Sequence, residues 1–236
     1  AQLHAALALP ASDPDFGPQP TTAEDLATWR AAALEQAQSA RTALETLRAQ
    51  GSAESAARAA AVLERWDDVL AVLTLPARVP AAKARCHGDL HLGQVLVVSD
   101  DVYFMDFEGE PARDLAARRA RHSPLRDVAG MLRSFDYAVR KLQHESDGLR
   151  PQSGPALAPR LRDWLAELRT AVLDRYFAQA RDCPTVPEGA VTRAALLRFF
   201  SAEKVLYELA YEAGNRPHWL DIPAHGLLEL LDGGAP

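Results

Sequence analysis

Apolar positions recur along most of the chain at intervals of three and four residues, which is the period of an amphipathic helix. The pattern begins after Thr22, an N-cap residue followed three positions later by Asp25, and predicts a helix that ends at Gly51. A second helix is predicted from Ser55 to Leu75. The chain is therefore expected to be mainly helical. Further helices are predicted from the Ser123-Pro124 pair onward and at about 160–181, 190–213 and 223–232.

One segment replaces the helical pattern with β-branched and aromatic residues. Val95–Val98 and Val102–Asp106 are typical of strands, and the polar run between them predicts a tight turn. A short strand is predicted at Arg85–His87, while Pro10–Pro20 and Ser146–Pro159 are predicted loops. The expected fold is thus mainly α with a small β-hairpin. We place a boundary after residue 84, between a helical subdomain at 1–84 and a catalytic part at 85–236.

Composition narrows the class of protein. The chain has 236 residues, of which 48% are hydrophobic and 25% charged, the balance of a globular protein. A net charge of −6 lacks the basic footprint of a nucleic-acid binder. No apolar run approaches the roughly 18 residues of a membrane span, and the N-terminus lacks the basic lead of a signal peptide. Two cysteines, Cys86 and Cys183, are too few for a disulfide framework. We expect a cytoplasmic protein with no nucleic-acid or membrane partner.

The candidate chemistry surrounds the hairpin. Asp89 and Gln94 are five residues apart in a predicted loop, and Asp106 follows twelve residues after Gln94, at the end of the hairpin. Kinases use this order of an aspartate, an amide residue and a second aspartate. Phosphoryl transfer needs a carboxylate that accepts the proton of the attacking hydroxyl, and oxygen ligands for magnesium ions that neutralise the phosphates.

The segment His87-Gly88-Asp89-Leu90-His91 resembles the catalytic loop of aminoglycoside phosphotransferases and related small-molecule kinases. The runs Asp106–Pro111 and Ser123–Tyr137 are closer to the maltokinases, which occur alone or fused behind a trehalose synthase. The resemblance extends from about Ala1 to Leu231. It implies the C-terminal lobe of a protein-kinase-like fold.

This resemblance also implies roles for single residues. Asp89 would be the catalytic base and His87 would brace its loop by hydrogen bonds. Gln94 and Asp106 would bind Mg²⁺, with Glu108 as a possible additional ligand. The co-substrate would be ATP. The reaction would convert maltose to maltose 1-phosphate, with a fused or associated trehalose synthase as a possible partner.

The acceptor sugar is expected near the C-terminal helices. Lys204, Tyr207 and Tyr211 are spaced three and four residues apart and share one helical face. Tyrosine offers a ring for the apolar face of a sugar and a hydroxyl for its polar edge. The resemblance adds Asn215 to this set. Aromatic residues at this spacing are more often packing residues, so a core position is the alternative.

The parts of a kinase that grip ATP are not found in this sequence. It contains no Gly-x-Gly-x-x-Gly, and its lysines are Lys83, Lys141 and Lys204, none of which lies in a predicted strand before Asp89. We therefore expect a fragment with the N-lobe absent, inactive by itself.

Other interpretations remain open at this stage. His87 and His91 are four apart, which allows a zinc site, although that spacing is meaningful mainly on a helix. Glu108 is equally compatible with a solvated turn. The enzyme could act on an aminoglycoside or another sugar, but an aminoglycoside site should be rich in acids, whereas 203–220 is mixed in charge. The chain could also be a non-catalytic module that binds a glycan or regulates a trehalose synthase. Cys86, Met131 and Phe135 are predicted to be buried.

Overall fold

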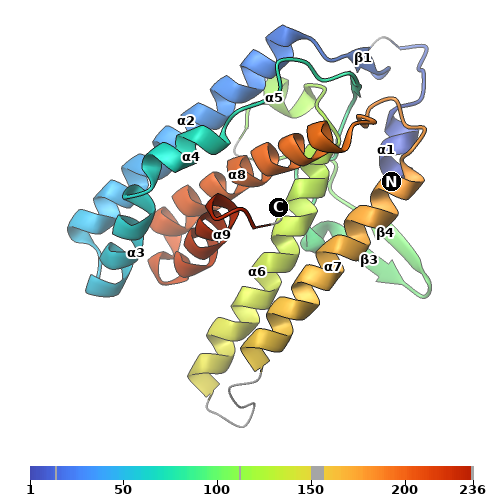
Figure 1. The fold of residues 1–236 in the computed structure, drawn as a ribbon. Coiled ribbons are helices and arrows are strands. Elements are labelled where there is room, and N and C mark those ends of the chain that lie inside the picture. The colour runs from blue at the N-terminus through green and yellow to red at the C-terminus, as the bar shows by residue number, and fades with distance from the viewer. Residues whose placement is uncertain (14, 112, 150–156, 235–236) are drawn as a thin grey trace. The chain divides into compact units, whose positions relative to one another are not determined.

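The structure, a computed structural model, describes residues 1–13, 15–111, 113–149 and 157–234, and it is mainly helical as predicted (Figure 1). Its contacts form two compact units, one of residues 1–20 and 80–188 and the other of residues 21–79 and 189–236. The predicted boundary after residue 84 differs from this grouping. The reason is that the helices before residue 79 pack with the helices after residue 189, so that one core draws on both ends of the chain.

The second unit is built around the long helix α2 (Ala23–Gln50), which begins as predicted. The Asp25 N–H donates to Thr22 Oγ1 at 3.2 Å and the Thr22 N–H donates to Asp25 Oδ2 at 2.8 Å, so the capping box is complete. Helix α2 packs against α3 (Ala53–Leu63) and α8 (Ala190–Asn215), and α8 packs against α9 (Asp221–Leu231). The buried face of α2 consists of Leu26, Trp29, Ala33, Ala37, Ala40, Leu44 and Leu47.

The predicted helix from Ser55 to Leu75 is wrong in one respect, because it is two helices. Helix α3 ends at Leu63 and α4 covers Trp66–Val72. Arg65 between them has φ −104° and ψ 23°, and its guanidinium binds Asp68 and Asp232 at 3.0 and 2.6 Å. In α4 the residues Trp66, Val69 and Val72 face the core, whereas Leu70 is exposed.

In the first unit, α6 (Leu125–Leu149) and α7 (Leu157–Gln179) lie side by side. Asp136 on α6 is completely buried and binds Arg133 and Arg140 of its own helix and Arg169 of α7, the latter two at 2.9 and 3.6 Å. Burial alone would raise the pKa of the Asp136 carboxyl, but the three guanidinium groups hold that pKa below its usual value. The ion pairs therefore join the two helices at a charged, buried point.

Two short antiparallel sheets complete this unit. Strands β3 (Val95–Val98) and β4 (Asp101–Phe104) form the predicted hairpin, although β4 is shifted toward the turn. A second pair, β1 (Gln19–Pro20) and β2 (Ala82–Lys83), was not predicted.

The predicted strand at Arg85–His87 is wrong. These residues are irregular, and the strand lies earlier, at β2, followed by a single bridge between Ala84 and His122. The physical reason is that the N–H groups of His87 and Gly88 donate to the carboxylate of Asp127, so they are not available to a neighbouring strand.

One predicted loop is partly helical. Helix α6 continues to Leu149 and α7 begins at Leu157, so both ends of the predicted loop at 146–159 are helical, and residues 150–156 lie outside the described residues. Helix α1 (Gln2–Leu7) precedes the first predicted helix. Met131 and Phe135, predicted in the core, are only partly buried because they lie at the edge of the buried face of α6. Three short helices complete the described part of the fold. They are η1 (Leu92–Gln94) and α5 (Leu115–Arg119) in the first unit and η2 (Pro217–Trp219) in the second.

Within the described ranges, every helix is too short or too polar to pass through a bilayer.

Candidate active site

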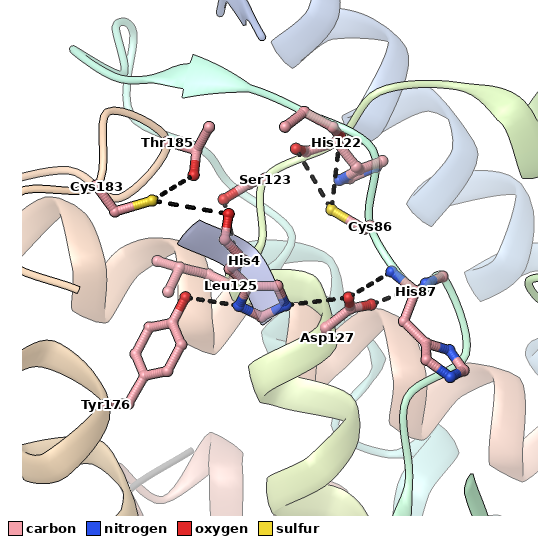
Figure 2. A network of polar contacts seen from close by, with 12 residues as sticks. His4, Cys86, His87, His122, Ser123, Leu125, Asp127, Tyr176, Cys183 and Thr185 are labelled. Atoms are coloured by element: carbon pink, nitrogen blue, oxygen red, sulfur yellow. Dashed lines mark hydrogen bonds and ion pairs between the residues drawn. The ribbon is translucent and has the colours of Figure 1, made fainter. Parts of the chain in front are cut away.

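The loop that carries Asp89 is anchored by one buried carboxylate, Asp127, in the first turn of α6 (Figure 2). The His87 N–H donates to Asp127 Oδ2 at 2.7 Å and the Gly88 N–H donates to Oδ1 at 2.9 Å, so both oxygens bind the loop backbone. Burial by itself would raise the pKa of this carboxyl, but the hydrogen bonds from His4, Gly88 and His87 keep the pKa below its usual value. Asp127 therefore remains an anion that holds the loop directly before Asp89.

A third donor reaches Asp127 from helix α1. His4 Nε2 lies 3.2 Å from Asp127 Oδ2, and His4 Nδ1 lies 2.9 Å from the hydroxyl of Tyr176 on α7 (Figure 2). A carboxylate can only accept, so Nε2 carries the proton and the Tyr176 hydroxyl donates to Nδ1 when the ring is neutral. Burial raises the pKa of Tyr176, which keeps its hydroxyl protonated. The chain thus links α1, α7 and the loop through one polar network.

Sequence reasoning did not find this network. The three side chains come from positions 4, 127 and 176, and no local pattern connects them. The sequence offered one signal for it. Asp127 is an acid near the start of a predicted helix, and it lies in the run Ser123–Tyr137 that carries the family resemblance.

His87 makes contacts of the kind that the predicted bracing role requires, and the role itself stays a prediction. The side chain is buried, its Nε2 lies 2.8 Å from the backbone carbonyl oxygen of Met105, and its ring lies 4.9 Å from that of Phe107. Because a carbonyl accepts, Nε2 donates. The loop is therefore tied to the segment that follows β4, where Asp106 lies. Next to it, Cys86 is only partly buried, unlike the prediction, but the desolvation of its thiol still raises its pKa, as expected for an unreactive cysteine.

Gln94 and Asp106 come together across the base of the hairpin. Gln94 Nε2 donates to Asp106 Oδ2 at 3.0 Å, and the Met105 N–H donates to the Gln94 carbonyl at 3.0 Å. Asp106 has φ 60°, a left-handed conformation that aspartate tolerates better than most residues. The Asp106 carboxylate is held by the hydrogen bond from Gln94.

These side chains suit a magnesium ion. Mg²⁺ prefers oxygen and is commonly held by one or two carboxylates together with substrate phosphates. The Gln94 amide lies beside the Asp106 carboxylate with its nitrogen toward it, so Gln94 would bind the ion through its Oε1 atom after the amide turns. Glu108 lies apart from this pair in its contacts, since its largely exposed carboxylate lies 3.9 Å from Arg118 Nη1. Its role as a ligand stays a prediction. The part of the chain that the structure describes contains no group of three His, Cys, Asp or Glu side chains arranged for a metal, which leaves the zinc alternative without support.

The predicted acceptor residues lie in the second unit and contact one another on α8. Lys204 Nζ is 4.8 Å from the ring centroid of Tyr207, and the rings of Tyr207 and Tyr211 are stacked at 6.4 Å with an angle of 20°. Asn215 Nδ2 donates to the Tyr211 carbonyl, and Tyr211 is 45% exposed. These residues therefore form a partly exposed row along the helix, where the alternative of core packing would require burial.

The row continues beyond the predicted residues. The guanidinium of Arg216 lies 5.3 Å from the ring of Tyr211 and 5.0 Å from that of Trp219, and it is also held by the buried Glu212 at 2.6 and 2.9 Å. A cation between two rings gives the end of α8 a surface of alternating rings and charges.

Substitution of Gly130 is expected to displace the loop that carries Asp89, because α6 packs against this loop at Gly130. A Cβ at Gly130 on α6 would lie 2.7 Å from the carbonyl oxygen of Leu90, the residue after Asp89. Gly130→Ala should therefore destabilise the protein by about 1–3 kcal/mol in urea unfolding, because the loop must move away. Gly214→Ala is the control, since no atom lies within 4 Å of a Cβ there. Equal stability of the two variants would show that the loop yields without cost.

No model of a known protein family matches the chain. Among curated proteins, it is 32% identical over 234 residues to a glucosamine kinase of Mycolicibacterium smegmatis, covering 99% of the chain and 52% of that protein. It is 29% identical over 231 residues to a glucosamine kinase of Streptacidiphilus jiangxiensis, covering 98% of the chain and 47% of that protein.

Solved structures give the same picture. A glucosamine kinase in crystal form B matches with a TM-score of 0.74 and 28% identity, covering 98% of the chain and 51% of its own. A glucosamine kinase in complex with glucosamine, ADP and inorganic phosphate matches with a TM-score of 0.73 and 27% identity, over 98% and 49% of the two chains. The chain spans about half the length of the relatives it matches. Along that half, it is similar in sequence and in structure to sugar kinases.

Proposed function

We propose that this chain carries the catalytic loop and the metal-binding hairpin of an ATP-dependent kinase that phosphorylates a small sugar. The contact between Gln94 and Asp106 at 3.0 Å carries the proposal, because it joins the two metal-binding positions of the predicted motif. The similarity to glucosamine kinases, one of them in complex with glucosamine, ADP and inorganic phosphate, supports it independently.

On this proposal each residue has a task in phosphoryl transfer. Asp89 orients the hydroxyl of the sugar and accepts its proton as that oxygen attacks the γ-phosphate. Gln94 and Asp106 would hold magnesium, which neutralises charge on the phosphate oxygens when it is bound. His87 and Asp127 hold the loop through the hydrogen bonds to Met105 and to the backbone N–H groups. The chain's own contribution is thus a proton acceptor on a fixed loop.

Glucosamine is the first candidate for the acceptor, because the relatives named above are glucosamine kinases. Maltose is the second candidate. It is favoured by the resemblance of the loop and hairpin motifs to maltokinases, and the rings of Tyr207 and Tyr211 on α8 offer aromatic groups of the kind that sugars contact. A fused or associated trehalose synthase would accompany the second candidate only.

The proposal extends to the fold. A catalytic loop followed by a hairpin and then by an aspartate matches the C-terminal lobe of a protein-kinase-like fold. Since the sequence holds no Gly-rich phosphate loop, the isolated chain is expected to lack ATP turnover, and a longer protein would supply the nucleotide-binding lobe.

The test is ADP release by the full-length natural protein with glucosamine, glucose, maltose or an aminoglycoside, in the presence of Mg²⁺. We expect release that depends on glucosamine, and its loss in Asp106→Asn. Release with maltose alone would select the second acceptor. ADP release that is independent of every sugar, or absent, would contradict the proposed function and favour the non-catalytic interpretation.

Acceptor binding can be measured on the chain alone. Calorimetry with glucosamine and with maltose should show saturable binding to the chain, weakened in Tyr211→Ala and Lys204→Ala. Unchanged binding in both variants would place the acceptor away from the row on α8.

A further inference from the structure

His91 holds a fixed orientation in the loop. It lies at the N-cap of η1, and the Gly93 N–H donates to its Nδ1 at 3.0 Å. A ring nitrogen that accepts from an N–H carries no proton, so the neutral ring must carry its proton on Nε2. One backbone group therefore selects the tautomer of this histidine.

The position of the ring depends on the absence of a side chain at residue 93. A Cβ at Gly93 would lie 2.7 Å from His91 Cε1 and 2.9 Å from His91 Nδ1, which is closer than such atoms can approach. The ring edge that carries Nδ1 and Cε1 thus lies close against the backbone of Gly93. Its free rotation is restricted on one side by this contact and by the hydrogen bond to Nδ1.

The other edge of the ring faces the proposed base. His91 Nε2 lies 3.8 Å from Asp89 Oδ2, and the Asp89 side chain is 15% exposed whereas that of His91 is 36% exposed. This distance is longer than a hydrogen bond but within the range of an electrostatic contact, and catalytic hydrogen bonds are commonly long before substrate binds. The nitrogen that carries the proton is therefore the ring atom within electrostatic range of the Asp89 carboxylate.

We infer that His91 is a positioning residue for Asp89, an inference that rests on the proposed function. The Gly93 N–H fixes the tautomer, and the Nε2–H group orients the Asp89 carboxylate so that its other oxygen meets the sugar hydroxyl. His87 cannot replace it, because the Nε2 of His87 is engaged by the carbonyl of Met105. On this inference His91 acts through Asp89.

Two variants of His91 separate this role from a role in the turn alone. Asparagine places an amide oxygen near the position of Nδ1, so His91→Asn keeps the acceptor for the Gly93 N–H and loses the group that faces Asp89. Glutamine places an amide nitrogen near the position of Nε2, so His91→Gln keeps a donor for Asp89. The full-length protein is assayed for kcat and for the KM of ATP and sugar.

We expect His91→Asn to lower kcat by about 10- to 100-fold with unchanged KM values, a loss typical of a group that orients a functional residue. His91→Gln should restore most of that loss. A kcat of His91→Gln as low as that of His91→Asn, or a wild-type kcat in His91→Asn, would overturn the inference. Wild-type protein without sugar-dependent ADP release would instead overturn the proposed function, so the two failures are distinct.

Discussion

Asp89→Asn is expected to lower kcat for sugar phosphorylation by about 10² to 10⁴, the usual contribution of a general base. Asparagine has nearly the same shape, and the backbone of the loop is held by Asp127 through His87 and Gly88, so the loop should keep its conformation. The amide cannot accept the proton of the attacking hydroxyl. The measurement is steady-state ADP release by the full-length protein, with KM determined for both substrates.

Asp100→Asn is the matched control, since Asp100 lies in the exposed turn of the hairpin that follows the Asp89 loop. It should leave kcat unchanged. A wild-type kcat in Asp89→Asn would show that the Asp89 carboxylate does not act as the general base. A large rise in KM with unchanged kcat would assign Asp89 to substrate binding instead.

Asp127→Asn is expected to destabilise the first unit by about 3 kcal/mol, the order of cost found when one partner of a buried charged contact is removed. Both oxygens of Asp127 accept hydrogen bonds, at 2.7, 2.9 and 3.2 Å. In Asp127→Asn one carboxylate oxygen is replaced by an NH₂ group. That group can only donate, and it would face the N–H groups that now donate to Asp127. Urea unfolding of this chain measures the loss, and hydrogen exchange at the His87 and Gly88 amides locates it. Asp163→Asn, on the exposed side of α7, should change stability by less than about 0.5 kcal/mol.

The effect of Asp127 should depend on pH in a defined direction. The pKa of Asp127 is lower in the folded protein than in the unfolded chain, so the ionised carboxylate contributes stability above about pH 4. That contribution is lost as pH falls through the folded-state pKa. The stability difference between wild type and Asp127→Asn should therefore shrink at acidic pH. A difference that grows below pH 4 would contradict the direction of the shift.

Local patterns predicted the elements that local interactions create. The capping box of Thr22 and Asp25 placed the start of α2, and β-branched runs placed the hairpin, because both signals lie within a few residues. The contact of Gln94 with Asp106 was also accessible, since a hairpin joins positions on either side of it. In each case the interacting residues are close in sequence, so a local pattern is enough to predict their contact.

Features set by distant contacts were not predictable in this way. The break at Arg65 is accompanied by an ion pair with Asp232, 167 residues away, and the irregular backbone at His87 reflects the carboxylate of Asp127. His4, which supports that carboxylate, lies in a helix for which no signal was recognised. The sequence carries these partners, but nothing in its local pattern brings them together.

The order in which the chain passes between its two units has a consequence for synthesis. Helix α2 ends at Gln50, and its main partner α8 begins only at Ala190. During translation, the apolar face of α2 therefore leaves the ribosome long before α8 has been synthesised. Residues 80–188 can already fold together in this interval. We expect the nascent chain to expose Leu26, Trp29 and Leu44 during this interval, which makes α2 a segment that benefits from a chaperone.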